Sequence, residues 1–294
     1  MSTVESTTLS HESLSRRGEA SSTAALIINA DDWGRDQETT DRIRECALRG
    51  TVSSVSAMVF MKDSERAANI AQEKGIDAGL HLNFTTPFSG ACCSAQLLER
   101  QRQTAAYLRR HRLAQVLYHP GLARSFQYVF YSQMEQFDRL YQRTPIRLDG
   151  HHHMHLCANV LLGKLLPKGT IVRRNFCFTG QEKGLMNRLY RRVLDRFLAR
   201  NHFLVDFFFQ LEPLEPKDRL QRIFSLSRQF VVEVEAHPAK ADEYRFLTSG
   251  EVSDCLRGIP IAPRFARRPS EIIPEPRLTN SRHVLPGRSR MQRD

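Results

Sequence analysis

The sequence predicts an α/β protein, an incomplete or distorted (β/α) barrel of the TIM type with mostly parallel strands. Short apolar segments alternate with segments of helical period along most of the 294 residues. The first apolar segment is a continuous run, which is typical of a buried parallel strand. Polar side chains follow several of these segments, at the place where an α/β protein carries its chemistry. A doubly wound open sheet is the alternative arrangement.

The first part of the domain has the pattern of a β-α-β-α-β unit. Its expected elements are a strand at 25–29, a helix at 36–50, a strand at 52–60, a helix at 64–74 and a strand at 77–84. Gly50 and Gly75 end the two helices, as glycine often does. Strands that are separated by helices imply right-handed crossovers and a parallel sheet.

The second part continues the alternation. Its expected elements are a helix at 126–141, a strand at 145–148, a helix at 158–166, a strand at 170–173, a helix at 182–200, a strand at 203–208, a helix at 216–229 and a strand at 230–236. Segment 94–118 is polar and rich in Gln and Arg. It is expected to form a helical insertion or a lid over the carboxyl edge of the sheet. The domain as a whole is expected to span residues 25–262.

The two ends of the chain differ in composition from the domain. Residues 1–24 are rich in Ser, Thr and Glu and are expected to form a disordered leader. Residues 263–294 are basic, contain prolines and lack an apolar period, so a disordered tail is expected. From residue 264 onward the tail has eight arginines against three acids. It therefore supplies +5 (8 − 3) of the net charge of +11.

The basic charge first suggests a nucleic acid or an anionic surface as partner. The arginines at 188, 191, 192, 196 and 200 recur at helical spacing, however, which is typical of a solvated helix face. Because no nucleic-acid-binding module accompanies them, no specific nucleic acid is expected. Six cysteines without a Cys-x-x-Cys motif indicate a reducing compartment. No run approaches the ~20 apolar residues of a membrane span, so a cytoplasmic protein is expected.

A histidine cluster is the most informative segment of the chain. Four of its 11 histidines lie within residues 149–155 (DGHHHMH), directly after the expected strand at 145–148. Histidine is the commonest metal ligand and readily moves a proton near neutral pH. Asp149 would add an oxygen ligand or orient one of the histidines. A solvated polar turn without a function is the competing interpretation.

Polar residues also occur at three other expected strand ends. Asp31 and Asp32 follow the first strand, His81 lies in the third, and His237 follows the last and precedes Pro238. Each has an ordinary alternative, respectively a helix N-cap, a buried core histidine and a simple strand stop. Their recurrence at strand ends favours a shared site at the mouth of the barrel.

An Asp-His-His set is a common open metal site, because three protein ligands leave positions for water and substrate. A divalent metal would lower the pKa of a bound water towards ~7 and polarise a carbonyl. The second aspartate would then accept the proton of that water. Arg173 or Arg174, at the end of the strand at 170–173, would orient Asp31 or bind substrate. An ordinary salt bridge is the alternative for these arginines.

The polar motifs, taken in order, also resemble a known family. Segments 29–34 (NADDWG), 79–83 (GLHLN), 148–155 (LDGHHHMH) and 235–238 (EAHP) are similar to those of the YdjC-like carbohydrate deacetylases. This family includes chitooligosaccharide deacetylases and a hopanoid-biosynthesis branch. The resemblance covers about residues 25–262. It implies a distorted (β/α) barrel, one divalent metal ion and the removal of N-acetyl groups from sugars.

The resemblance also implies roles for single residues. The metal ligands would be Asp32, His81 and His151, while Asp31 would be the general base and His237 the acid. Contact with substrate, or support of these groups, would fall to Asn83, Asp149, His153, His155 and Arg173. The metal of this family is often magnesium, whereas two histidine ligands suit zinc or another transition metal better. The identity of the metal therefore stays open.

The function expected from these features is a metal-dependent hydrolase that removes N-acetyl groups from a carbohydrate. Its partner would be an acetylated sugar or sugar conjugate, and a homodimer is an option. A metal-dependent barrel isomerase or phosphoesterase would use the same residues. A non-catalytic sugar-binding protein is a further alternative. Release of acetate would separate deacetylation from all of them.

Overall fold

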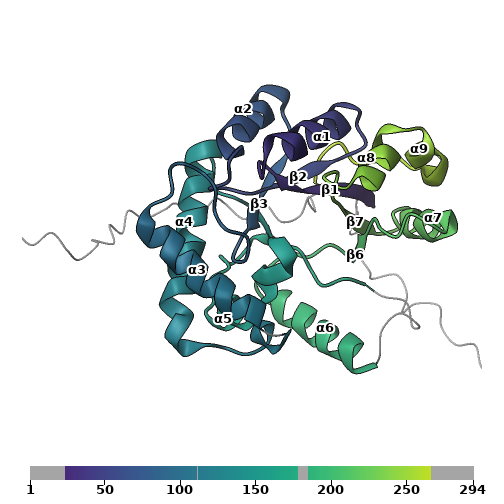
Figure 1. Ribbon diagram of the computed structural model, residues 1–294. Coiled ribbons are helices and arrows are strands. Elements are labelled where there is room, and N and C mark those ends of the chain that lie inside the picture. Colours follow the sequence, from purple (N-terminus) through teal and green to yellow (C-terminus); the bar gives the residue numbers. More distant parts are fainter. Residues whose placement is uncertain (1–23, 111, 178–184, 266–294) are drawn as a thin grey trace, which may run out of the picture.

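The computed structural model describes residues 24–110, 112–177 and 185–265. Only residue 24 of the expected leader and residues 263–265 of the expected tail lie within these ranges. The rest of both segments lies outside the described residues, so the two predictions of disorder remain predictions. The expected helix at 182–200 is described from residue 185 onward. Figure 1 shows the described chain as a curled sheet with helices on its outside.

The described residues form one sheet of seven strands in which every neighbouring pair is parallel. The strands are β1 (Ala25–Trp33), β2 (Ser54–Ala57), β3 (Ala78–Leu82), β4 (Arg147–Gly150), β5 (Ile171–Val172), β6 (Phe207–Gln210) and β7 (Val231–Ala236). Their order is β5-β4-β3-β2-β1-β7-β6. Read as a circle, this order follows the chain, and it opens between β5 and β6. The expected incomplete (β/α) barrel is thereby confirmed.

Helices cover the outer face of the sheet. The α-helices of the described residues are α1 (Gln37–Leu48), α2 (Ser64–Lys74), α3 (Ala95–Arg110), α4 (Ala123–Tyr141), α5 (Ala158–Leu162), α6 (Leu185–Leu198), α7 (Lys217–Leu226), α8 (Ala241–Thr248) and α9 (Glu251–Leu256). Three 3-10 helices join them: η1 (Arg112–Gln115), η2 (Pro120–Leu122) and η3 (His151–Leu156). Asp36 caps α1 by accepting from the backbone N–H of Thr39. Gly75 ends α2 in the left-handed conformation, as its sequence position predicts.

The two faces of the sheet have opposite character. Residues paired across parallel strands share a face, and residues two apart along a strand share it as well. One set, which includes Ile28, Val55 and Leu80, packs against the helices in the main hydrophobic core. The other set, which includes Asn29 paired with Glu235 and His81 paired with Asp149, faces the barrel interior. The main apolar core thus lies outside the barrel, and the interior holds these polar groups together with a smaller apolar cluster that includes Ile27 and Phe208, both paired with Glu233.

Several strand boundaries differ from those predicted, most clearly at β1, β2, β4 and β6, of which β4 spans Arg147–Gly150 instead of 145–148. β1 runs on to Trp33, so the aspartate doublet belongs to the strand rather than to the loop after it. β2 is shorter than the predicted 52–60. β6 begins at Phe207 instead of 203, where Phe203 forms one isolated bridge with Ile171. Between Phe203 and the start of β6, the Asp206 side chain accepts a hydrogen bond from the backbone N–H of Val231.

Segment 94–118 forms α3 and η1 beside the carboxyl edge of the sheet. The Gln101 side chain donates to the backbone oxygen of Thr86 at 2.7 Å, and Thr104 donates to that of Phe84 at 3.4 Å. These oxygens belong to the loop that follows β3. Its action as a lid remains a prediction. Among the described helices, none has the length and apolarity needed to cross a membrane.

Gly79 of β3 allows the close approach of a buried arginine inside the barrel. A Cβ at this position would lie 2.8 Å from Nε and 2.9 Å from Cζ of Arg147. The guanidinium of Arg147 is itself fixed by Asn29 and by the backbone oxygen of Val55. A methyl group can therefore be accommodated only by moving a bonded, buried group.

We expect Gly79→Ala to destabilise the protein by about 1–3 kcal/mol, the usual cost of overpacking. Urea unfolding followed by circular dichroism would measure the change. Gly250→Ala is the matched control, because a Cβ there meets no atom within 4 Å. Equal unfolding midpoints for the two variants would contradict the packing described for Gly79.

Candidate active site

The two adjacent aspartates lie at a β-bulge near the carboxyl end of β1. The register of β1 with β2 shifts between Ala30 and Trp33, and the backbone of Asp32 is left-handed, with φ at 70°. Aspartate visits this conformation more often than most residues do. Because a bulge re-aims the side chains around it, Asp31 and Asp32 can both reach the interior. Both are buried.

One carboxylate oxygen of Asp32 is held and the other is not. Arg35 donates to Oδ2 at 2.7 Å, whereas Oδ1 lies 3.0 Å from His151 Nδ1 and 3.6 Å from His81 Nε2. Within the described residues, the buried atoms Asp32 Oδ1 and His81 Nε2 have no hydrogen-bond partner. Burying an unsatisfied polar atom is costly. Two such atoms that face each other indicate that a cation fits between them.

Asp149 determines which nitrogen of His81 faces this point. Asp149 Oδ1 lies 2.8 Å from His81 Nδ1, so Nδ1 carries the proton and Nε2 presents its lone pair. Carboxylates orient metal-binding histidines in this way. His151 packs edge-on against His81, with ring centroids 5.5 Å apart. One ligand atom each of Asp32, His81 and His151 lies within 4.8 Å of the others, so this donor set fits a divalent metal.

Arg173 lies fully buried inside the barrel and joins four carboxylates. Its two terminal nitrogens donate to both oxygens of Asp31, at 2.7 and 2.8 Å. Nη2 also lies 3.0 Å from Asp149 Oδ2. Nε donates to Glu233 at 2.8 Å, and Nη1 donates to Glu235 at 3.1 Å. One guanidinium therefore links Asp31 to Asp149, the group that orients His81.

This network separates the pKa values of its carboxyl groups. Burial alone would raise the pKa of Asp31, but Arg173 and His81 outweigh it and hold that pKa well below its usual value. Burial and the neighbouring charge of Asp31 raise the pKa of Glu235 well above its usual value. Asp31 is therefore ionised at neutral pH, and Glu235 beside it binds a proton more readily than Asp31 does. Neighbouring carboxyls with divergent pKa values are typical of acid–base sites.

His237 lies at the carboxyl end of β7, next to the same carboxylates. One of its ring nitrogens is within 4.8 Å of oxygens of Asp31 and Glu235. Its backbone N–H donates to Glu243 at 2.6 Å, and the following Pro238 restricts its backbone. Among the described residues, no group forms a hydrogen bond with the buried Nδ1 of His237. The ring is held in place with one nitrogen available.

His155 helps to fix the backbone of Arg173. It is fully buried, and its Nε2 donates to the backbone oxygen of Arg173 at 2.9 Å. Gly150 makes this packing possible, because a Cβ on Gly150 would lie 2.9 Å from the backbone nitrogen of His155. The η3 turn can therefore fold back against the end of β4 and carry His151 to Asp32.

The remaining histidines of the cluster point elsewhere. His153 Nε2 lies 3.6 Å from Glu235, and its ring packs edge-on against Phe176. His152 is exposed, and its Nδ1 lies 2.9 Å from Thr85 Oγ1. His152 and His153 both have left-handed backbones. The His152 ring lies 4.0 Å from the His151 ring, between centroids, whereas the His153 ring lies against Phe176. His151 is thus the member of the cluster that lies beside Asp32.

Asn83 holds the loop that follows β3. Its side-chain oxygen accepts from the backbone N–H groups of Thr85 and Thr86, at 3.1 and 2.9 Å. Its side-chain nitrogen donates to the backbone oxygen of Thr86 at 2.8 Å. Asn83 is fully buried, so the structure uses it to position Thr85 and, through Thr85, His152.

Sequence reasoning assigned no role to Glu233, Glu235 and Asn29. Asn29 donates to Asp31 Oδ1 at 2.8 Å, and the two glutamates complete the carboxylate set around Arg173. The signal was present in β7, which reads VVEVEA. Two acids at alternate positions of an otherwise apolar strand share one face. Acids are rarely buried without a partner, so this spacing indicates a buried cation opposite them.

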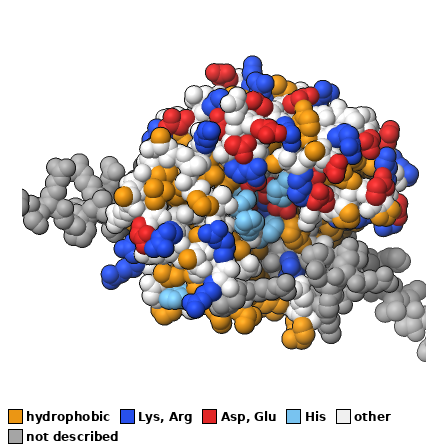
Figure 2. Space-filling view, in the orientation of Figure 1, with side chains coloured by type: hydrophobic (Ala, Val, Ile, Leu, Met, Phe, Trp, Pro, Cys, Tyr) orange, Lys and Arg blue, Asp and Glu red, His pale blue; other side chains and the backbone are white. Residues whose placement is uncertain are grey.

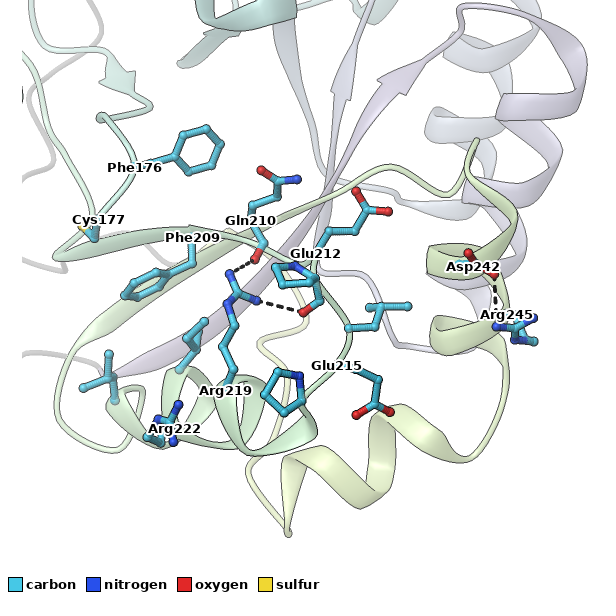
Figure 3. Close-up of a pocket in the computed structure, with 15 residues that line it drawn as sticks. Phe176, Cys177, Phe209, Gln210, Glu212, Glu215, Arg219, Arg222, Asp242 and Arg245 are labelled. Atoms are coloured by element: carbon cyan, nitrogen blue, oxygen red, sulfur yellow. Dashed lines mark hydrogen bonds and ion pairs between the residues drawn. The ribbon is translucent and has the colours of Figure 1, made fainter. Parts of the chain in front are cut away.

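A large pocket adjoins the site at the carboxyl end of β6. Its volume is about 1140 Å³, and its lining includes Phe176, Phe209, Gln210 and Arg245. Figure 3 shows Phe176, Phe209 and Gln210 on one side of it, with Arg219 reaching the Gln210 carbonyl. Phe176 also contacts His153. In Figure 2 histidine side chains gather near the centre of the same face, with acidic side chains next to them.

Because His155 is buried, the free energy of unfolding should decrease at acid pH. Burial lowers the pKa of His155 from 6.5 to about 4, although its bond to Arg173 opposes the shift. As pH falls from about 6.5 to about 4, the unfolded chain binds a proton that the folded chain does not. Stability present above pH 6.5 is therefore lost across this range, by an amount on the order of 3 kcal/mol.

We expect His155→Gln, which keeps a donor for the Arg173 carbonyl, to reduce this loss. Urea unfolding at pH 7, 5.5 and 4.5 would measure it. His119→Gln, which changes an exposed histidine, is the control and should retain the parental slope. A parental pH slope in His155→Gln would show that His155 is not the group responsible.

Comparison with known proteins shows relatives over most of the chain. The family profile described as YdjC-like protein matches residues 25–258. A carbohydrate deacetylase from Vibrio cholerae serotype O1 is 28% identical over 256 residues, covering 79% of this chain and 90% of the relative. A chitooligosaccharide deacetylase from Yersinia pestis is 27% identical over 232 residues, covering 76% and 85%.

Comparison of structures shows the same fold in a crystal structure from Enterococcus faecalis V583. That protein was assigned provisionally to cellobiose-phosphate cleavage. Its chain superposes with a TM-score of 0.60 at 18% identity, covering 84% of this chain and 98% of the other. The family match itself runs from the first strand through α9 and includes every site residue described above. The chain belongs to the YdjC-like protein family.

Proposed function

We propose that this protein is a metal-dependent carbohydrate N-deacetylase. The observation that carries the proposal is the pair of buried atoms without partners, Asp32 Oδ1 and His81 Nε2, beside His151. Asp31 Oδ2 lies 3.9 Å from the same His81 nitrogen, which brings a candidate base to the candidate metal point. Relatives named carbohydrate deacetylase and chitooligosaccharide deacetylase support the choice of reaction.

Asp32, His81 and His151 would hold the metal ion. When bound, a divalent ion supplies Lewis acidity, which polarises an acetamide carbonyl and makes water more acidic. Arg35 and Asp149 form hydrogen bonds with the atoms of Asp32 and His81 that would not bind the metal, namely Asp32 Oδ2 and His81 Nδ1. These bonds fix the orientation of both side chains. Two imidazoles with one carboxylate suit zinc or another transition metal, whereas magnesium prefers oxygen ligands.

Asp31 would accept the proton of the attacking water. Arg173 and Asn29 hold its two oxygens in place, and Arg173 keeps it ionised at neutral pH. When Asp31 takes up a proton, Asp149 and Glu233 still balance the charge of Arg173. The buried network can therefore hold both protonation states of Asp31, as a general base requires.

His237 would give a proton to the departing amine. Its ring lies on the β7 side of Asp31, whereas His81 of β3 and His151 of η3 lie on the other side, and the bond from its backbone to Glu243 fixes its position. A base and an acid on two sides of the reacting carbon separate the two proton transfers that amide hydrolysis requires. Glu235 lies beside the same groups, and burial and the charge of Asp31 raise its pKa, so its protonated form is favoured more than that of Asp31.

The substrate would be an acetylated sugar or sugar conjugate that extends into the pocket beside β6. Phe176 and Phe209 offer flat apolar surfaces to sugar rings, and Gln210 offers an amide to their hydroxyl groups. Phe176 contacts His153, which in turn lies beside Glu235. This chain of contacts leads from the pocket to the carboxylates of the site.

Metal analysis of purified variants would test the assignment of ligands. We expect the parent protein to bind one divalent ion and Asp32→Asn to lose most of that affinity, because a neutral amide replaces a charged ligand. Asp31→Asn should keep the metal. Asp41→Asn, on the solvent side of α1, is the control. Parental metal content in Asp32→Asn would rule out Asp32 as a ligand.

Acetate release from N-acetylglucosamine oligomers would test the reaction. We expect Asp31→Asn to lower kcat at least about 100-fold, the usual contribution of a general base, while Asp41→Asn retains the parental rate. Removal of the metal by a chelator should abolish turnover, and added zinc or magnesium should restore it. Sugar interconversion or phosphate release without acetate would instead support the isomerase or phosphoesterase alternative. Sugar binding without any product would support a binding protein.

A further inference from the structure

Helix α6 presents an unusual amount of apolar surface to solvent. Met186 is 76% exposed, Leu189 is 49% exposed and Val193 is 56% exposed. These residues, with Phe197, recur at helical spacing and so form one stripe. The opposite side of the helix packs inward through Leu198, which is buried. A helix of a globular protein normally buries its apolar stripe. The exposed stripe of α6 therefore calls for a binding partner.

The stripe continues onto neighbouring elements. A groove of about 230 Å³ runs between α6 and the segment around η1 and α5, and its lining includes Val116, Leu162, Val193 and Phe197. Leu162 is itself 61% exposed. We call Val116, Leu162, Met186, Leu189, Val193 and Phe197 the apolar face. A contiguous exposed surface of this kind marks an interaction site.

Basic residues surround the apolar face. Arg192 and Arg196 are exposed on α6, Lys164 and Lys168 follow Leu162, and Arg110 ends α3. The sequence from residue 100 to residue 134, which includes Val116, has no Asp or Glu. The charge of this surface is therefore positive.

The one acidic residue of α6 is turned inward. Asp195 accepts from Arg174 at 2.8 Å and from the side chain and backbone of Asn175 at 3.0 and 3.1 Å. Its negative charge is neutralised within the fold and does not offset Arg192 or Arg196. An apolar stripe flanked by uncompensated arginines is the pattern of a helix that lies in the interface of an anionic membrane.

We propose that the apolar face docks on the surface of an anionic lipid bilayer. The apolar side chains would enter the acyl boundary, and the flanking Arg and Lys groups would bind lipid phosphates. A second copy of the chain fits less well, because a two-fold interface would join two identical basic surfaces, and the segment from residue 100 to residue 134 has no acid to pair with the arginines of α6. A nucleic acid would leave the apolar stripe without a partner.

Docking would place the candidate active site beside the membrane. Leu156, at the end of η3, lines the same groove, and His151 begins the same 3-10 helix. Figure 1 shows α6 at the lower edge of the molecule. In the same orientation Figure 2 shows hydrophobic side chains along that edge, below the histidines. A sugar held at a membrane surface would then lie near the barrel mouth.

Cosedimentation with lipid vesicles tests the proposal independently of catalysis. The full-length protein would be mixed with phosphatidylcholine vesicles that contain or lack phosphatidylglycerol, at low and high salt. We expect binding to the anionic vesicles alone, and weaker binding at high salt because the charges are screened. Arg192→Gln and Arg196→Gln should each weaken binding about fivefold, the contribution of one basic residue near an anionic surface.

The apolar contribution needs its own variant and control. Leu189→Gln with Val193→Gln should reduce vesicle binding at least tenfold, because two exposed apolar side chains leave the stripe. Leu48→Gln with Arg44→Gln is the matched control, since both side chains are exposed on α1, at the opposite edge of Figure 1. This control should bind as the parent does. Circular dichroism would confirm that each variant folds.

Three outcomes would overturn the proposal. They are a parent protein that stays in the supernatant with anionic vesicles, a Leu189→Gln/Val193→Gln variant that binds like the parent, and a parental dimer that this variant converts to monomer. The same preparations would be assayed for acetate release from a soluble sugar. Vesicle binding without acetate would count against the deacetylase proposal alone, and acetate without vesicle binding would count against the docking proposal alone.

Discussion

The buried guanidinium of Arg173 is the interaction on which the rest of the site depends. It lies in a cavity lined by carboxylates from β1, β4 and β7, and it is the cation that allows Asp31 and Asp149 to stay ionised there. Removing one partner of a buried ion network leaves uncompensated charge, at a cost of roughly 3–5 kcal/mol. Through Asp31 and Asp149 the same group sets the position of the candidate base and of His81. Stability and chemistry therefore share one residue.

This arrangement explains why the barrel has its apolar core outside and its charges inside. A closed barrel of this type fills its interior with branched apolar side chains in layers. Here the outward-facing residues of the strands form the hydrophobic core with the helices, and the inner positions carry Asn29, Arg147, Asp149 and Glu235. A preformed electrostatic site therefore occupies part of the interior, beside a small apolar cluster that includes Ile27 and Phe208. Such a site stabilises developing charge without reorganising when substrate arrives.

The sequence predicted seven mostly parallel strands of an incomplete barrel, because apolar and helical segments alternate along it, and the polar residues after the strands indicated where the site lies. Several strands begin or end elsewhere than predicted. The sequence did not predict how the polar residues share their roles. The histidine cluster reads as four equivalent donors, and the left-handed backbones of His152 and His153, which give the four rings different neighbours, have no local sequence signal. The glutamates of β7 were visible as alternating acids, but their partner Arg173 is 60 residues away from Glu233. Only the curl of the sheet brings them together.

Because of the bulge at Asp32, positions 31 and 32 tolerate different substitutions. Asp31 has an ordinary strand backbone, so its side chain alone limits the choice of residue there. Position 32 needs a residue that tolerates a positive φ and that also offers a charged carboxylate. Asparagine satisfies the first requirement and glutamate satisfies the second, while aspartate satisfies both. Across the sequences of this family, position 32 should therefore vary less than position 31, although both positions carry a carboxylate in this chain.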